Sequence, residues 1–240
     1  MTEQFQARRG CVPDDEKNFS PVGIEIMRKA SRHIGYLINE GYDLKQAATF
    51  VGNHFLLSER QRLAVMRSLA TKEQLRDRES KRIPKAELAG RDVWIDGFNT
   101  VITLEVLLCD SILLDCMDGT VRDLAALRGT YRMIPETHDA VKLLLDILLE
   151  AQIRSAMILL DAPVSNSGRL KTLIAEIGEA CPFGLDIQII KDVDRDLYSR
   201  ENVITSDSVI LDRCVSWINL ISECVNRENK TAFRVWEQVE

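Results

Sequence analysis

The sequence predicts a mixed α/β protein in which a small all-helical module precedes a larger domain built on a mostly parallel sheet. Apolar residues recur at spacings of three and four between residues 22 and 78, which is typical of amphipathic helices. From residue 91 the pattern changes, and from residue 137 onward short apolar runs alternate with helix-like segments. This alternation favours parallel strands that are joined by right-handed crossovers. We therefore divide the chain into a flexible arm (1–20), a helical module (21–80), a linker (81–90) and an α/β domain (91–240).

The helical module contains start and stop signals for successive helices. The first helix is expected to end at Gly41, because glycine commonly follows the last turn of a helix. Asp43 can cap a second helix over residues 44–50, and Ser58 can cap a third. Residues 71–90 carry charges of both signs in mixed order, and we interpret them as a charged connector.

The second and third of these helices have the outline of a helix-turn-helix. Arg60, Arg62 and Arg67 lie on or near its last helix, where such folds contact nucleic-acid phosphates. Charge agrees with this interpretation, because residues 1–90 carry 16 Lys and Arg against 12 Asp and Glu, whereas residues 91–240 carry 15 against 25. Any three-helix bundle shares the outline, so a solvated helical surface without nucleic-acid contacts is the alternative.

In the α/β domain, apolar runs predict strands and the segments between them predict helices. The predicted strands are 92–96, 156–161, 186–190 and 202–205, and the predicted helices are 137–151, 168–180 and 208–225. The stretch 100–118 is ambiguous. We interpret it as a helical turn at 103–109 followed by a strand at 112–116.

The composition predicts a protein of the reducing cytoplasm with no membrane partner. The N-terminal residues are polar, so no secretory signal is expected, and no apolar run approaches the ~20 residues that a membrane-spanning helix needs. The six cysteines form no C-x-x-C pair and match no zinc template. A homo-oligomer is compatible with these features.

Three of the apolar runs end in an aspartate, namely Asp96, Asp161 and Asp207. Because ligands of parallel sheets bind beyond the carboxyl ends of the strands, we expect these side chains to converge at one edge. Clustered carboxylates repel one another unless a hard cation joins them, and oxygen ligands favour Mg²⁺ or Mn²⁺ over zinc. Asn99, which follows Asp96 by about one helical turn, can hold that carboxylate or contact a metal-bound water. The alternative is structural, with Asp96 in a turn and Asp207 as a helix cap.

Polar and basic residues near the same edge are candidates for binding a phosphate backbone. Asp161 is followed by a polar loop that leads into a helix, and the free N–H groups at a helix start can hold a phosphate. The candidate substrate-binding residues are Arg122, Arg128, Ser165, Ser167, Arg169 and Ser206. Two alternatives stay open: Ser167 is a simple helix cap, and the arginines form surface salt bridges.

A third acidic motif follows the predicted strand at 186–190. Asp192, Asp194 and Asp196 resemble the opening of a calcium loop. Leu197 and Val203 stand where an EF-hand requires glycine and glutamate, which excludes that motif. One of these acids can still face the aspartate cluster.

Asp115 and Asp118, with Gly119 and Thr120, resemble the signature of haloacid-dehalogenase-like phosphatases. In that signature the two acids stand two residues apart, and here they stand three apart, which would misdirect one of them. A turn at Asp118 and Gly119 is the preferred interpretation. The chain also has no Walker loop, no G-x-G-x-x-G and no supportable nucleophilic triad, which disfavours nucleotide-dependent phosphoryl transfer and dinucleotide chemistry.

Taken together, the segments that end in Asp96-Gly-Phe-Asn99, Leu-Leu-Asp161 and Ile-Thr-Ser-Asp207 resemble the motifs of the PIN-like nucleases, in particular the NYN branch. The resemblance covers residues 91–225. It implies an α/β three-layer sandwich in which those three aspartates and Asn99 form a site that uses Mg²⁺ or Mn²⁺ to cut RNA. The segment 101–135 departs from the ordinary PIN pattern.

The whole chain is also similar to an uncharacterised prokaryotic family that is known only as a domain of unknown function. Members of that family combine a helical module, matched here by residues 41–64, with an α/β part. The matching stretches of the α/β part are Asp96 to Asn99, Asp118-Gly119, Arg122-Asp123, Ser165 to Gly168 and Ser206-Asp207. This second resemblance brings no established activity.

These observations favour a metal-dependent ribonuclease with RNA, or alternatively DNA, as its partner. The three strand-terminal aspartates would hold the metal, while Asn99 and Ser206 would orient the ligands. The first alternative is a non-catalytic module that keeps the fold and binds nucleic acid or a protein partner. The second is hydrolysis of small phosphomonoesters, which would depend on Asp115 or Asp118.

Overall fold

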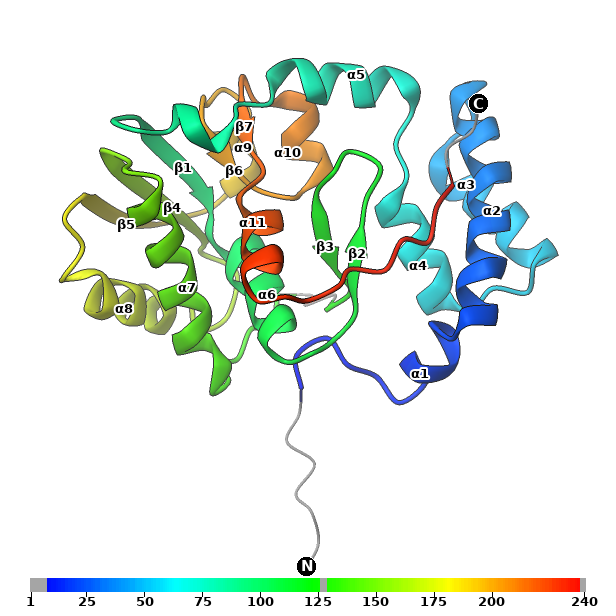
Figure 1. Ribbon diagram of the computed structural model, residues 1–240, viewed down its shortest axis with the longest axis horizontal. Helices are drawn as coiled ribbons and strands as arrows, with labels where there is room; N and C mark the ends of the chain where they lie inside the picture. Colours follow the sequence, from blue (N-terminus) through cyan, green and yellow to red (C-terminus); the bar gives the residue numbers. More distant parts are fainter. Residues whose placement is uncertain (1–7, 126–128, 238–240) are drawn as a thin grey trace, which may run out of the picture.

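A parallel sheet covered by helices occupies one side of the molecule, and the helical module occupies the other (Figure 1). A short antiparallel hairpin lies between the two parts. The computed structural model describes residues 8–125 and 129–237. Within these ranges no helix is long and apolar enough to cross a membrane.

The central sheet has five strands in the order β5-β4-β1-β6-β7, and all its pairings are parallel. Its strands are β1 (Asp92–Asp96), β4 (Ser155–Asp161), β5 (Gly184–Ile190), β6 (Val203–Ile204) and β7 (Trp217–Ile218). The predicted α/β class with a mostly parallel sheet is therefore confirmed. The predicted strands 92–96, 156–161, 186–190 and 202–205 all belong to this sheet, and β7 is an additional strand of it that the sequence did not indicate.

Helices cover both faces of this sheet and bury two separate apolar clusters. The larger cluster lies beneath α6 (Gly97–Leu108), α7 (Glu136–Glu150), α8 (Ser167–Gly178) and α11 (Leu220–Arg227). The opposite face is covered by α9 (Val193–Leu197) and α10 (Ser208–Arg213). The sheet is thus the middle of three layers.

Two predicted elements of the α/β domain were wrong in extent. The helix expected over 208–225 is broken into α10 and α11, because Trp217 and Ile218 leave the helical path and pair with β6. Trp217 is fully buried, and its indole nitrogen donates to the carbonyl of Arg78 at 2.7 Å. In the ambiguous stretch 100–118, α6 is longer than the expected turn, and the strand β2 is confined to Leu113–Asp115.

The helical module consists of α1 (Asp15–Asn18), α2 (Pro21–Asn39), α3 (Leu44–His54), α4 (Glu59–Ser68) and α5 (Lys72–Lys81), followed by the 3₁₀ turn η1 (Lys85–Glu87). Asp43 and Ser58 cap α3 and α4 as predicted, and each accepts a backbone N–H of the first turn. The helix α5 corrects the expected connector. Thr71 and Gln74 form a reciprocal capping box at its start, a signal that outweighs the mixed charges.

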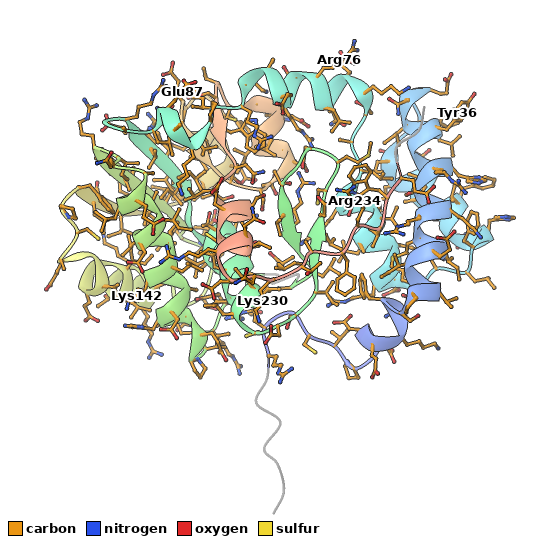
Figure 2. All side chains as sticks on the ribbon, in the orientation of Figure 1. Tyr36, Arg76, Glu87, Lys142, Lys230 and Arg234 are labelled. Atoms are coloured by element: carbon orange, nitrogen blue, oxygen red, sulfur yellow. The ribbon has the colours of Figure 1, made fainter. Side chains whose placement is uncertain are left out.

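The helical module shares its apolar core with the hairpin formed by β2 (Leu113–Asp115) and β3 (Val121–Asp123). Leu114, Cys116 and Leu124 pack into the same cluster as the apolar faces of α2, α3 and α4. The C-terminal segment closes this junction, where Arg234, labelled in Figure 2, donates to Asp115 at 2.7 Å.

Part of the expected flexible arm is an ordered component of the fold. The side chain of Arg9 is only 8% exposed and donates to the fully buried Glu105 at 2.7 Å. Asp15 joins this segment to α4, because Arg60 of that helix donates to both of its carboxylate oxygens. The prediction was therefore wrong for residues 8–20, because ion pairs from distant elements hold them. Residues 1–7 lie outside the described residues.

Gly97, at the junction between β1 and α6, lies in close contact with β4. A Cβ at Gly97 would meet Leu160 Cδ2 at 2.6 Å and the carbonyl oxygen of Leu159 at 2.7 Å. Because the second of these atoms is backbone, Gly97→Ala is expected to lower the free energy of unfolding by about 1–3 kcal/mol. Gly168 of α8 has open space around it, so Gly168→Ala should leave stability unchanged or raise it. Urea unfolding of both variants checks this, and equal losses would contradict it.

Candidate functional site

Acidic residues follow the carboxyl ends of three adjacent strands of the sheet. Asp96 is the last residue of β1, and Asp161 is the last residue of β4. Asp207 follows β6 and caps α10. The three strands are adjacent in the order β4-β1-β6, so these residues emerge on the same side of the molecule.

Asp96 is the most buried member of this group, with 5% of its surface exposed. It accepts a hydrogen bond from Thr205 Oγ1 at 2.9 Å. Burial raises the pKa of Asp96 to about 8, and the negative charges of Asp207, Asp194 and Asp161 add to the effect. Without a cation, this carboxyl group is therefore largely protonated at neutral pH.

Asp194, in the first turn of α9, is the acid of the 192–196 motif that faces the cluster. The Asp194 residue is exposed, but partial loss of hydration raises the pKa of its carboxyl group, and the negative charges of Asp207, Asp161 and Asp192 add to this rise. Burial also raises the pKa of Asp161, which receives a backbone hydrogen bond from Val193 that acts in the opposite direction. The charges of Asp161, Asp194 and Asp207 all raise the pKa of Asp96, and we call these four acids the carboxylate edge (Asp96, Asp161, Asp194 and Asp207).

Asp207 performs the structural role that the sequence offered as an alternative. Its Oδ1 accepts the backbone N–H groups of Val209 at 2.7 Å and Ile210 at 3.4 Å. Within the described part of the chain, its Oδ2 has no hydrogen-bond partner. Capping therefore leaves one oxygen of this carboxylate available for another ligand.

Among the described residues, Asn99 forms no hydrogen bond with Asp96, and Thr205 bonds to that carboxylate instead. The Asn99 side-chain oxygen instead accepts from Ser206 Oγ at 2.8 Å and from Ser206 N at 3.2 Å. Thr205 Oγ1 in turn accepts from the backbone N–H of Asp207 at 3.0 Å. Asn99 and Thr205 together fix the turn of residues 205–207 against β1 and α6, and we call this segment the site turn.

Arg122 is not available to bind a phosphate, which corrects the prediction. Its side chain is 8% exposed, and it donates to the carboxylate of Asp118 and to the carbonyl groups of Ser206 and Arg67. The negative charge of buried Asp118 accounts for this, because a buried carboxylate requires a cationic partner. Arg128 lies outside the described residues.

The other predicted phosphate ligands lie in the loop after Asp161 and in the first turn of α8, and they differ in their bonding and exposure. Ser165 bonds to the backbone of Tyr131, accepting from its N–H and donating to its carbonyl, both at 2.9 Å. Ser167 is the first residue of α8 and not its cap, because the capping position is held by Asn166 in a left-handed conformation. Arg169 is exposed in the first turn of α8.

The basic residues of α4 are bonded inside the protein. Arg60 donates to Asp15 and to the Leu124 carbonyl, and Arg67 bonds to the carbonyl and carboxylate of Asp123. Arg62 donates to the carbonyl of Leu57, just before α4, and to the side chain of Asn53 in the last turn of α3. The helix-turn-helix interpretation therefore loses the phosphate contacts that favoured it.

The phosphatase-like motif is also structural. Asp118 has a side chain only 1% exposed, and it forms ion pairs with both Arg78 and Arg122. Thr120 donates to it from its hydroxyl at 2.6 Å. Burial acts to raise the pKa of Asp118, but the two arginines and the bonds from Thr120 hold it below the ordinary value. Such a permanently paired carboxylate is poorly suited to act as a nucleophile or acid.

The donor chemistry of the carboxylate edge fits a hard divalent cation, but the side chains do not converge tightly. Across residues 8–125 and 129–237, no three or more His, Cys, Asp and Glu side chains form a group that could hold a metal ion. A cation would have to draw the carboxylates closer together than they lie in this structure. The predicted Mg²⁺ or Mn²⁺ site thus stays a prediction.

Comparison with known proteins identifies the family but not the chemistry. The family model "Domain of unknown function (DUF5616)" matches residues 85–223, more than half of the chain, and "Protein of unknown function (DUF434)" matches residues 26–81. The Methanocaldococcus jannaschii protein described as "Uncharacterized protein MJ0935" is 34% identical over 201 residues, which are 83% of this chain and 96% of that protein. No solved structure matches. The chain therefore belongs to this uncharacterised prokaryotic family, as its sequence predicted.

The raised pKa of Asp96 gives a pH dependence of stability with a definite sign. Its value in the fold, about 8, lies above its ordinary value of 3.8, so the protonated form favours folding. This contribution is complete below about pH 4 and is lost as the pH rises to about 8. In metal-free buffer, Asp96→Asn should therefore unfold with a flatter pH profile than the wild type and be relatively more stable at pH 8. Parallel profiles in urea unfolding at several pH values would contradict this.

Proposed function

We propose that this protein is a metal-dependent ribonuclease of the PIN-like, NYN type. The observation that carries the proposal is the carboxylate edge, four acids that lie beyond the carboxyl ends of the central parallel strands. A bound divalent cation relieves the mutual repulsion of neighbouring carboxylates, and oxygen donors suit Mg²⁺ or Mn²⁺. The three-layer arrangement and the parallel strand order support a PIN-like fold.

Under this proposal, each residue of the carboxylate edge and of the site turn has a separate role. Asp96, Asp161 and Asp207 would hold the metal, with Asp194 as a further carboxylate. A bound Mg²⁺ or Mn²⁺ would supply Lewis-acid chemistry and offset the charge of the phosphodiester. Thr205 would keep Asp96 in place, because its hydroxyl already donates to that carboxylate.

Recognition of RNA would depend on the same cation and on few basic residues. An acidic edge repels a phosphate backbone unless a metal neutralises it. Arg169 is exposed at the start of α8, two residues from Ser167, and it is the remaining described arginine of the predicted set that is free to face solvent. A backbone phosphate would contact the start of α8. Ser206 would orient the metal-binding aspartates by holding the site turn against Asn99.

A non-catalytic binding module is the second candidate. It is favoured by the spacing of the carboxylates, since no three of the described acids form a metal-binding group. The internal bonding of Arg122 points the same way, because it removes one expected phosphate contact. In this case the α/β part keeps its fold and binds nucleic acid or a protein.

The two candidates are distinguished by assaying labelled RNA with Mn²⁺. If the nuclease proposal is correct, the wild type cleaves, and Asp96→Asn and Asp207→Asn each reduce the rate by about a hundredfold or more. Asp186→Asn, a change at an exposed residue within β5, should leave the rate unchanged. Cleavage by every variant would indicate a contaminating nuclease. Cleavage by none, with RNA still bound, would favour the non-catalytic module.

Metal binding itself is measured by thermal unfolding at neutral pH. Mn²⁺ at about 100 times its dissociation constant adds about 2.7 kcal/mol, which corresponds to a rise in melting temperature of about 5–10 °C for a domain of this size. Asp194→Asn should reduce this rise, because it removes one of the coupled carboxylates, whereas Asp186→Asn should retain it. A full rise in the Asp194 variant would remove that residue from the metal site.

A further inference from the structure

The site turn connects two acids of the carboxylate edge. Thr205 Oγ1 donates to Asp96 and accepts from the backbone N–H of Asp207. Ser206 donates twice to the side-chain oxygen of Asn99, at the start of α6. The sheet and α6 therefore hold one side of this turn.

Arg122 of β3 holds the other side. Its Nε donates to the carbonyl oxygen of Ser206 at 2.6 Å. Its two terminal nitrogens donate to the carboxylate of Asp118 and to the carbonyl of Arg67, in the last turn of α4. Because the guanidinium is a rigid planar fork, three simultaneous partners fix both its place and its orientation. The Ser206 carbonyl is thereby tied to the helical module.

Asp118 extends the same connection to α5. The oxygen that accepts from Arg122 also accepts from Arg78 Nη1 at 2.6 Å. Arg78 donates further to Asp212 of α10 at 2.6 Å and to the carbonyl of Ser208 at 3.4 Å. It is 2% exposed, whereas Arg76 of the same helix points away from the molecule (Figure 2). The helix thus directs one arginine inward, to the residues that follow the site turn.

We propose that Arg122 is a positioning residue for the candidate site, and that the helical module fixes the site turn through Arg67 and Arg78. The inference rests on the proposed function only in treating the carboxylate edge as the functional site. Arg122 acts through Ser206 and touches no substrate, because all three of its nitrogens are bonded inside the protein. The role of the helical module is then to hold the site turn of the α/β part in its conformation.

The test is amide hydrogen exchange by NMR on the full chain. In Arg122→Gln, the amides of Ser206, Asp207 and Val209 should exchange about tenfold or more faster, because a charged hydrogen bond that holds their turn is lost. The amide of Ile158, in the middle of β4, reports global unfolding, so the acceleration of the three amides is expected relative to Ile158. Arg122→Lys, which keeps the charge and one donor, should restore part of the protection.

Arg60→Gln is the matched control. The side chain of Arg60 is also largely buried, with 14% of its surface exposed, and it bonds to a carboxylate and to two backbone carbonyls. None of these partners belongs to the site turn. It should lower global stability without accelerating the three amides relative to Ile158. If Arg122→Gln does not fold, Asp118→Asn is measured in the same way. Wild-type exchange of the site turn in these variants, or equal acceleration in Arg60→Gln, would overturn the proposal.

The exchange measurement uses neither metal nor RNA, so a lack of nuclease activity counts against the proposed function and not against the positioning role. Where cleavage is detected, Arg122→Gln should lower kcat and leave the KM for RNA nearly unchanged. A raised KM with an unchanged kcat would instead indicate direct contact with the phosphate backbone, and it would contradict the proposal.

Discussion

One buried carboxylate, that of Asp118, determines how the parts of this molecule fit together. A buried charge is costly unless it is paired and fully hydrogen-bonded, and removing one partner leaves the others uncompensated. Asp118 is shared by an arginine of the hairpin and an arginine of α5, and these two reach α4, α10 and the site turn. A shift of β3 or α5 would break an ion pair of Asp118, and a shift of α4 or the site turn would leave an Arg122 nitrogen without its carbonyl acceptor.

The carboxylate edge shows the opposite electrostatic arrangement. Within the described residues, no lysine, arginine or histidine forms an ion pair with Asp96, Asp161, Asp194 or Asp207. The fold pairs acids with arginines at its interior junction and leaves them without cationic partners at the sheet edge, where burial raises the pKa of Asp96. Under the proposed function, a divalent cation from solution would be the partner of this group.

Local sequence patterns predicted the elements that depend on local forces. Apolar runs located the strands that end in Asp96 and Asp161, and capping residues located α3 and α4. Tertiary contacts decided the rest. The strand β7 has two residues, too few for a periodic signal, and Arg78 lies in a segment whose charges suggest a solvated face. Thr205 joins the site only because the sheet order brings its loop to β1, and the local pattern of residues 192–196 could not tell which of its acids would face the cluster.

The hairpin of β2 and β3 has a consequence for how the chain unfolds. It belongs by sequence to the region matched by the DUF5616 model, yet Leu114 and Leu124 complete the apolar core of the helices that the DUF434 model matches. The boundary between the two family models therefore crosses a continuous interior. We expect the two regions to unfold in a single cooperative transition. Either fragment expressed alone should expose its apolar side of this interface and aggregate.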